Sequence, residues 1–128
     1  MRLLLDTHTL LWWSGKSRLL SAKARDLLED TTSEVFVSVA NAWEMQIKAQ
    51  VGKLTLHKPW SKIIRGQMET NGFRLLQVEL PHIEVLDQLP FHHKDPFDRL
   101  LLAQALHEGM TLVSNDSKLA QYPVSLIW

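Results

Sequence analysis

Two aspartates stand three residues apart at the start of an apolar, helix-forming run in the stretch KDPFDRLLLAQA. Asp95 precedes Pro96, as is typical of a helix N-cap followed by proline at the first helical position. Asp98 falls at the third helical position, where a carboxylate interacts favourably with the helix dipole. Capping alone can therefore explain both residues, so the rest of the chain must decide whether either does chemistry.

Three more acids stand close to short apolar runs: Asp6 in LLLDTHT, Glu44 in VFVSVANAWEMQIK and Asp116 in TLVSNDSK. If carboxylates gather in one place, a cation must neutralise them, because like charges a few ångströms apart raise one another's pKa. Carboxylate oxygens suit Mg²⁺ or Mn²⁺, which keep several waters and usually bind phosphate as well. The corresponding chemistry is metal-assisted attack of water on a phosphodiester.

Each of these acids also has a purely structural explanation. Asp6 and Asp116 can cap the helices that they precede. Glu44 can pair with Lys48 one helical turn later, although such a pair is worth only about a few tenths of a kcal/mol. Its apolar neighbours Trp43 and Met45 indicate a partly enclosed segment, in which an acid tends to be paired or to bind a cation.

Short apolar runs alternate with longer amphipathic ones along the chain. Strands are predicted at residues 3–5, 35–37, 75–78, 111–113 and 124–127. Helices are predicted at residues 7–13, 21–29, 40–50, 59–70, 81–87 and 96–107, with Gly72 and Gly109 ending two of them. Several strands are apolar on both faces, as in a parallel sheet covered by helices on both sides. The pattern predicts a three-layer α/β/α fold with right-handed crossovers.

The four acids occupy matching places relative to these elements. In an open parallel sheet the functional crevice lies beyond the carboxyl ends of the strands. Asp6 directly follows the first strand, Asp116 follows the fourth, and Glu44 lies on the helix after the second strand. Asp98 opens the helix that leads into the fourth strand and completes the set.

The composition limits the alternatives. A chain of 128 residues with 45% hydrophobic content is predicted to form one domain over residues 1–128. Lys and Arg number 14 and so do Asp and Glu, so a nucleic acid must be met by a local patch or a bound cation. The absence of cysteine excludes disulfides, thiolate metal sites and cysteine nucleophiles. No signal-peptide core or membrane-spanning run is visible, and a cytoplasmic protein without a membrane partner is expected.

Four motifs in order resemble a known family: LLLDTHTLLWW, SVANAWEMQIK, HHKDPFDRLLLAQA and TLVSNDSKL. Together they are similar to the PIN domain, specifically to the VapC-type toxins of bacterial toxin–antitoxin pairs, over essentially the whole chain. The resemblance implies a Mg²⁺- or Mn²⁺-dependent endoribonuclease acting on RNA, with an acidic pocket made by Asp6, Glu44, Asp98 and Asp116. It also implies a homodimer and a cognate antitoxin that occupies the pocket.

The resemblance implies different roles for Asp95 and Asp98. In the family's pattern one further residue separates the acid from a stretch like LLLAQA, which selects Asp98 for the pocket. Asp95 then keeps the capping role. Because Asp98 lies at a helix start, it faces free backbone N–H groups that can hold it ionised and oriented.

Other side chains are ambiguous. Ser38 and Ser114 lie at strand ends, where they either orient a metal water or phosphate or act as turn hydroxyls. Lys48 and Arg99 flank the predicted site and either meet RNA phosphates or balance the carboxylates. The six histidines fit no zinc spacing, which disfavours a histidine-based nuclease: His8, His57, His82, His92, His93 and His107.

Adjacent tryptophans, Trp12 and Trp13, cannot both point inward on one helix face, so at least one is expected on a partner surface.

Two other functions fit less well. An aspartyl-phosphate enzyme often carries a second acid two residues after the first Asp, and here that position is His8. A non-catalytic PIN-like module for RNA binding or scaffolding would be expected to have lost acids, and all four are present.

Overall fold

The computed structural model describes the whole chain, Met1–Trp128. Five strands form one sheet in the order β3-β2-β1-β4-β5, and every neighbouring pair is parallel. The strands are Arg2–Leu5 (β1), Glu34–Ser38 (β2), Arg74–Leu76 (β3), Thr111–Val113 (β4) and Leu126–Ile127 (β5). The central strand β1 ends one residue before Asp6, so the first predicted acid lies at the middle of the sheet's carboxyl edge.

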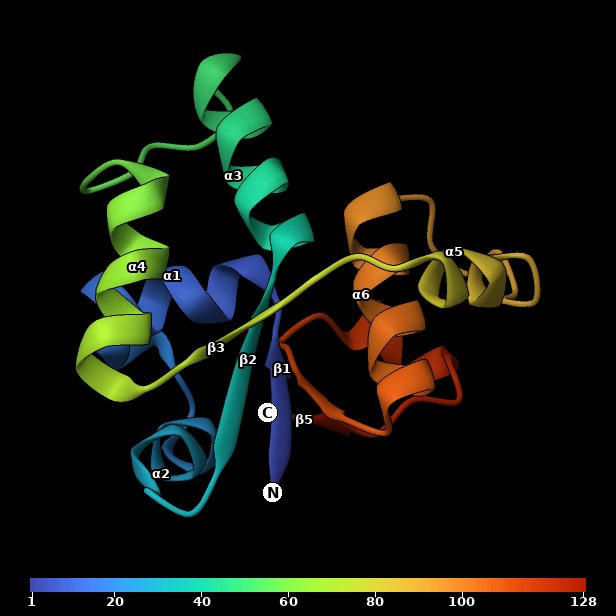
Figure 1. The fold of residues 1–128 in the computed structure, drawn as a ribbon, viewed down its shortest axis with the longest axis horizontal. Helices are drawn as coiled ribbons and strands as arrows, with labels where there is room; N and C mark the ends of the chain where they lie inside the picture. Colours follow the sequence, from blue (N-terminus) through green and yellow to red (C-terminus); the bar gives the residue numbers. More distant parts are fainter.

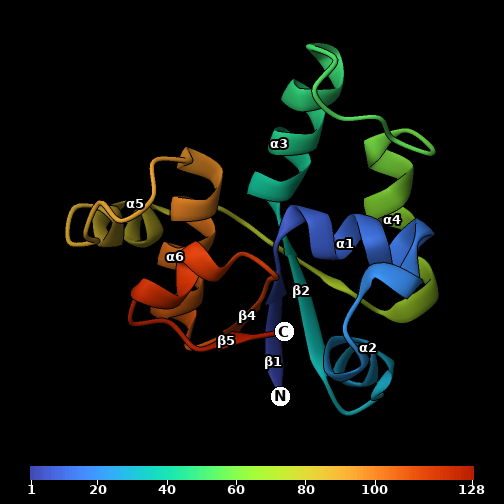
Figure 2. The ribbon, with the colours of Figure 1, turned by 180° about the vertical axis from the view of Figure 1, so that it is seen from behind.

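Helices cover both faces of the sheet. They are Thr7–Gly15 (α1), Ala22–Glu29 (α2), Val39–Gln50 (α3), Trp60–Asn71 (α4), Leu80–Leu86 (α5) and Pro96–Glu108 (α6), with short 3-10 helices at Ser17–Leu19 (η1) and Ser117–Gln121 (η2). Helices α1, α2 and α4 lie on one side and α5 and α6 on the other, while α3 extends beyond the end of β2 (Figures 1 and 2). This arrangement confirms the predicted three-layer α/β/α fold. No helix combines the length and apolar character needed to cross a bilayer.

The alternation of side chains along β1 explains the two cores. Leu3 and Leu5 belong to the core under α1, α2 and α4, whereas Leu4 belongs to the core under α6. All three side chains are fully buried. Successive residues of a strand point to opposite faces, so a sheet covered on both sides needs apolar residues without alternation.

The cap residues of α6 place its N-terminus at the carboxyl edge of the sheet. Asp95 accepts hydrogen bonds through Oδ1 from the backbone N–H groups of Phe97 and Asp98, at 2.8 and 3.1 Å. At the other end Gly109 has φ of 67°, a left-handed conformation that glycine adopts without strain. The helix therefore begins beside the predicted acids and returns the chain to β4.

Three predicted boundaries shift for local reasons. The predicted strand 75–78 ends at Leu76, because the carbonyl of Gln77 accepts a hydrogen bond from α6 instead of a neighbouring strand. The predicted strand 124–127 is reduced to Leu126–Ile127, after Pro123, which has no N–H for a ladder. The predicted helix 81–87 begins one residue earlier, because its first turn is closed by reciprocal capping at the residue before Leu80.

A buried glutamine, Gln104, links α6 to the carboxyl ends of β2 and β3 through hydrogen bonds. Gln104 is fully buried, and its Oε1 accepts a hydrogen bond from the Ser38 hydroxyl at 2.6 Å. Its Nε2 donates to the carbonyl of Gln77 at 3.2 Å. Ser38 also caps α3 by accepting from the backbone N–H of Ala40 at 2.9 Å, as expected for a turn hydroxyl. The amide of Gln104 thus helps to fix the start of the helix that carries Glu44.

Replacing Gln104 by leucine should lower the free energy of unfolding by about 1–3 kcal/mol, because the buried Ser38 hydroxyl and the Gln77 carbonyl each lose a hydrogen-bond partner. Urea unfolding followed by circular dichroism measures the change. Gln50→Leu is the matched control, since Gln50 is exposed and bonds only to Gln46; it should change stability by less than about 0.5 kcal/mol. Equal losses in the two variants would contradict the bridging role of Gln104.

Candidate active site

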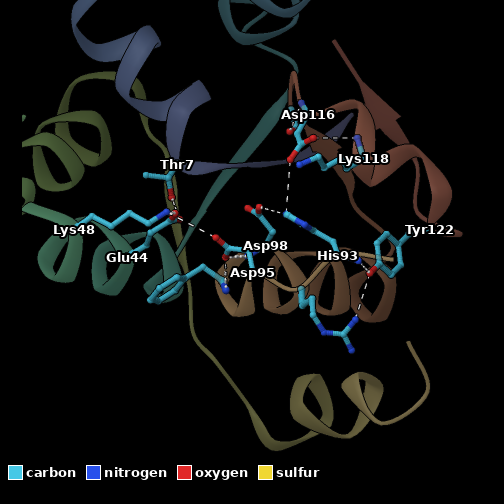
Figure 3. Close-up of polar contacts among 12 residues, drawn as sticks. Thr7, Glu44, Lys48, His93, Asp95, Asp98, Asp116, Lys118 and Tyr122 are labelled. Carbon is cyan, nitrogen blue, oxygen red and sulfur yellow. Dashed lines mark hydrogen bonds and ion pairs between the residues drawn. The ribbon is translucent and has the colours of Figure 1, made fainter. Parts of the chain in front are cut away.

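All four predicted acids lie at the carboxyl edge of the sheet. Asp6 follows β1 and caps α1, and Asp116 follows β4 and caps η2. Glu44 lies in the second turn of α3, and Asp98 lies in the first turn of α6. The carboxylates of Glu44 and Asp6 are near enough to Asp98 to raise its pKa. The structure thus brings together the residues that sequence reasoning selected, and Figure 3 shows three of them, Glu44, Asp98 and Asp116.

Glu44 is held through both carboxylate oxygens. Its Oε1 accepts a hydrogen bond from the Thr7 hydroxyl at 2.5 Å, and its Oε2 contacts Lys48 Nζ at 2.5 Å. Asn41 supports the first contact by donating from Nδ2 to Thr7 Oγ1 at 3.1 Å. Glu44 is 4% exposed and Met45 is fully buried, which confirms the predicted enclosed segment, although Trp43 is 58% exposed. Neighbours on a helix point about 100° apart, so Trp43 turns outward while Glu44 and Met45 face inward.

Lys48 supplies positive charge to this group of acids. Besides Glu44, its Nζ lies 3.8 Å from Oδ2 of Asp95. Burial opposes the charge of the ammonium group, but the hydrogen bond to Glu44 and the negative charges of Glu44, Asp95 and Asp98 outweigh it and raise the pKa of Lys48. The sequence left two interpretations of Lys48: contact with RNA phosphates or charge balance of the carboxylates. The contacts in the structure fit the second, because Lys48 pairs with Glu44 and lies near Asp95.

Asp95 and Asp98 face different partners. Asp95 caps α6 through Oδ1, as predicted, whereas Oδ2 of Asp98 lies 2.8 Å from His93 Nε2. Burial raises the pKa of Asp98 to about 6; the contact with His93 lowers it, and the charges of Asp95, Glu44 and Asp6 raise it. The expectation that the start of α6 holds Asp98 ionised is therefore wrong: the helix N–H groups of Phe97 and Asp98 donate to Asp95, and the pKa of Asp98 is raised. A bound cation would favour the charged form of Asp98.

His93 is the site residue that sequence reasoning missed. Its Nε2 lies between two acids, 2.8 Å from Oδ2 of Asp98 and 3.8 Å from Oδ2 of Asp116. The available signal was its place in the loop just before the Asp95 cap. Zinc-type spacing was the wrong criterion, because it does not describe a single histidine among carboxylates. The backbone N–H of His93 donates to the Tyr122 hydroxyl at 2.9 Å, which holds the loop in place.

Asp6 is buried at the end of β1, with 8% of its surface exposed. Its Oδ1 accepts a hydrogen bond from the backbone N–H of Thr9 at 2.9 Å. Burial raises the pKa of Asp6, while hydrogen bonds from the hydroxyl of Ser114 and from Thr9 oppose the shift. Ser114 also accepts from the backbone N–H of Asp116 at 3.1 Å, so it is a turn hydroxyl that connects two acids.

A cavity opens in front of these acids. It has a volume of about 240 Å³ and is lined by Asp6, His8, Trp12, Asn115 and Asp116. Because two of the four acids form its wall, solvent and small solutes can reach them from this side.

One sequence-based expectation about a neighbouring residue is wrong. Arg99 does not flank the acids: it is 6% exposed and donates to the carbonyl of Pro90 at 2.8 Å and to the Tyr122 hydroxyl at 3.3 Å. Its guanidinium group therefore stabilises the loop after α5. Trp12 and Trp13 are both partly buried and pack against the core that includes Leu10. That at least one of them meets a partner stays a prediction. The most exposed tryptophan is Trp43.

A second cluster of possible ligands lies near the other end of α6, formed by Glu79, His82 and Glu108. The Nδ1 atom of His82 accepts the backbone N–H of Glu79 at 3.0 Å, so the ring proton is on Nε2. That nitrogen faces Oε2 of Glu108 at 3.1 Å. The protonated nitrogen has no lone pair for a metal, and the cluster is a chain of hydrogen bonds that caps α5.

The donor set near Asp98 fits a divalent cation. His93, Asp98 and Asp116 each offer one ligand atom, and these atoms all lie within 4.8 Å of one another. Hard carboxylate oxygens are the ligands that Mg²⁺ and Mn²⁺ prefer. Burial, together with the charges of Asp95, Glu44 and Asp6, raises the pKa of Asp98, and a cation bound beside it would offset both effects.

Comparison with known proteins agrees with this geometry. A model of the PIN domain family matches residues 3–124. The chain belongs to the PIN domain family. Among proteins similar to this PIN domain is Ribonuclease VapC22 of Mycobacterium tuberculosis (strain ATCC 25618 / H37Rv), 28% identical over 122 residues that cover 93% of this chain and 90% of that protein.

Solved structures of toxin–antitoxin proteins share the fold of this PIN domain. The structure of VapBC2 from Rickettsia felis, bound to a promoter DNA fragment, matches with a TM-score of 0.76 at 16% identity. The match covers 100% of this chain and 99% of that chain. DNA-bound VapBC from Salmonella typhimurium gives a TM-score of 0.70 at 14% identity, covering 99% of this chain and 97% of that chain. At these identities the likeness shows the fold.

The raised pKa of Asp98 predicts a pH-dependent stability in the absence of divalent cations. Folded Asp98 keeps its proton up to about pH 6, whereas an unfolded aspartate loses it near pH ~3.9. Between these values the folded protein binds more protons, so its free energy of unfolding falls as the pH rises. Asp98→Asn should remove this loss and be more stable than wild type at pH 7 by on the order of 1–2 kcal/mol, allowing for solvent screening.

Urea unfolding in EDTA between pH 4 and 7 measures this difference. Asp26→Asn is the control, because Asp26 is an exposed aspartate on α2, away from the site. A difference between wild type and Asp98→Asn that stays constant across this pH range would contradict the assignment.

Proposed function

We propose that this PIN domain is a Mg²⁺- or Mn²⁺-dependent endoribonuclease and acts as the toxin of a toxin–antitoxin pair. The observation that carries the proposal is the convergence of Asp6, Glu44, Asp98 and Asp116 at the carboxyl edge of the sheet, where burial and mutual repulsion raise the pKa of Asp98. The similarity to Ribonuclease VapC22 supports the same activity.

The four acids are the residues that would hold the cation. A bound divalent cation lowers the pKa of water and stabilises negative charge on the leaving oxygen of a phosphodiester. Thr7 and Lys48 hold Glu44 in one orientation, and His93 contacts Oδ2 of Asp98. The Lys48 side chain is 29% exposed, so its ammonium group is also accessible to a phosphate of the RNA.

Asp98→Asn should lower the rate of RNA cleavage by roughly 100-fold or more, because it removes charge that holds the cation. Asp6→Asn should have the same effect. Asp95→Asn is the matched control: asparagine caps a helix as well as aspartate does, so most of the activity should remain. The measurement is cleavage of a mixed RNA pool with Mg²⁺ or Mn²⁺, with circular dichroism to show that each variant is folded.

Other outcomes of this assay separate the proposed function from its alternatives. Asp95→Asn as damaging as Asp98→Asn would mean that the roles of the two aspartates are wrongly assigned. RNA binding without cleavage would indicate a non-catalytic module. Phosphate release from small phosphate esters would indicate an aspartyl-phosphate enzyme.

We further propose that the antitoxin lies across the acidic cavity. A groove of about 310 Å³ runs beside it, with an apolar part formed by Leu11, Trp12, Leu54 and Leu56. The groove and the acidic cavity share His8 and Trp12, so one peptide segment can pass from the first into the second. Arginine is the side chain best suited to the acids, because its planar guanidinium group can meet two carboxylate oxygens at once.

If a basic antitoxin side chain takes the place of the cation, raising the Mn²⁺ concentration should weaken inhibition of RNA cleavage. The inhibition constant of the antitoxin, encoded by a neighbouring gene, is measured over a series of Mn²⁺ concentrations. Equal ionic strength made up with NaCl is the control, since salt alone screens exposed charges. Inhibition indifferent to Mn²⁺, together with an antitoxin footprint away from Asp6 and Asp116, would refute this mechanism. The homodimer and the cytoplasmic location expected from the sequence stay predictions.

A further inference from the structure

We propose that His93 is a direct ligand of the cation through Nε2, so that the site is a mixed imidazole–carboxylate site that favours Mn²⁺ over Mg²⁺. The inference rests on the proposed function only in placing a divalent cation among these acids. The sequence pattern contains four carboxylates and no histidine at this site. The structure adds an imidazole nitrogen between two of them.

The position of the ring carries the proposal. The Nε2 atom of His93 lies 2.8 Å from Oδ2 of Asp98 and 3.8 Å from Oδ2 of Asp116. Figure 3 shows the ring placed between the two carboxylates, with a contact to each. A cation bound by Oδ2 of Asp98 and Oδ2 of Asp116 would have Nε2 as its nearest further donor, since the three atoms lie within 4.8 Å of one another.

Neighbouring acids have fewer oxygens to offer than the sequence suggests. Thr7 and Lys48 occupy the two oxygens of Glu44, and the cap of α6 occupies Oδ1 of Asp95. One oxygen each of Asp6 and Asp116 also accepts a backbone hydrogen bond, so a nitrogen donor from His93 supplies a ligand where several carboxylate oxygens already have partners.

The loop holds His93 in place before any cation arrives. Its backbone N–H donates to the Tyr122 hydroxyl at 2.9 Å, and Arg99 donates to the same hydroxyl at 3.3 Å. The side chain of His93 is only 16% exposed. A ligand that is already oriented loses little conformational entropy on binding, so this arrangement favours coordination.

Coordination requires only the other neutral tautomer of the ring. His93 binds the cation through the lone pair of Nε2 and keeps its proton on Nδ1, while the hydrogen bond to Asp98 is replaced by bonds from both groups to the ion. Mg²⁺ strongly prefers oxygen ligands, whereas first-row transition metal ions accept imidazole. The nitrogen thus contributes to selectivity and not merely to affinity.

Electron spin echo envelope modulation of the Mn²⁺-loaded protein tests the ligand directly. Wild type should show modulation from a directly bound ¹⁴N nucleus. His93→Asn should lose it, and His92→Asn should keep it. His92 is the matched control, because it is the adjacent exposed histidine and packs against the Tyr122 ring instead of the acids. Wild type without ¹⁴N modulation would overturn the proposal, whether or not the variants fold.

The affinity for each ion gives a second readout. His93→Asn should weaken Mn²⁺ binding by at least about tenfold, as measured from the signal of free Mn²⁺. Mg²⁺ binding, measured by competition with Mn²⁺, should change by less than about threefold. Equal losses for both ions would overturn the selectivity. These measurements use no RNA, so ¹⁴N coordination in a protein that cleaves no RNA would support His93 as a ligand while contradicting the proposed function.

Discussion

Repulsion between carboxylates at one edge of the sheet is the constraint on which the rest of the structure depends. Asp6, Glu44, Asp95, Asp98 and Asp116 gather there, where burial and neighbouring charge raise the pKa of Asp98 to about 6. Lys48 neutralises part of this charge at Glu44 and Asp95, and His93 contacts Asp98 and Asp116. The remaining excess of negative charge is what makes the edge suitable for a divalent cation.

The fold positions these groups through backbone rules and buried polar contacts. Parallel strands bring Asp6 and Asp116 to the same edge, and the N-terminus of α6 delivers Asp98 to it from the helical layer. The polar contacts of Gln104 and Ser38 fix the start of α3, on which Glu44 lies one turn further along. Because these ties are buried, the site is held by the same interactions that stabilise the domain.

The sequence predicted those features that follow from periodicity and capping. Strands apolar on both faces indicated a covered parallel sheet, and the Asp95-Pro96 pair indicated the start of α6. The distinction between Asp95 and Asp98 needed the family resemblance as well, since both fit a helix start. The structure then gave each a different partner, the N–H groups of α6 for Asp95 and His93 for Asp98.

The features that the sequence did not predict depend on the direction of single side chains. Arg99 follows Asp98, but consecutive helical residues point about 100° apart, and Arg99 turns towards the carbonyls after α5. The same rotation exposes Trp43 while Glu44 is buried. His93 lies in a loop, where no periodicity indicates which way a side chain points, and only the tertiary contact with Tyr122 brings it to the acids.

The most direct test of this account is anomalous diffraction from crystals of the protein soaked in Mn²⁺, recorded on both sides of the manganese absorption edge. The account predicts an anomalous peak within bonding distance of Asp98 and Asp116, at the carboxyl edge of the sheet. A peak at Glu79, His82 and Glu108 instead, or no peak at the four acids with Mn²⁺ at a saturating concentration, would contradict it.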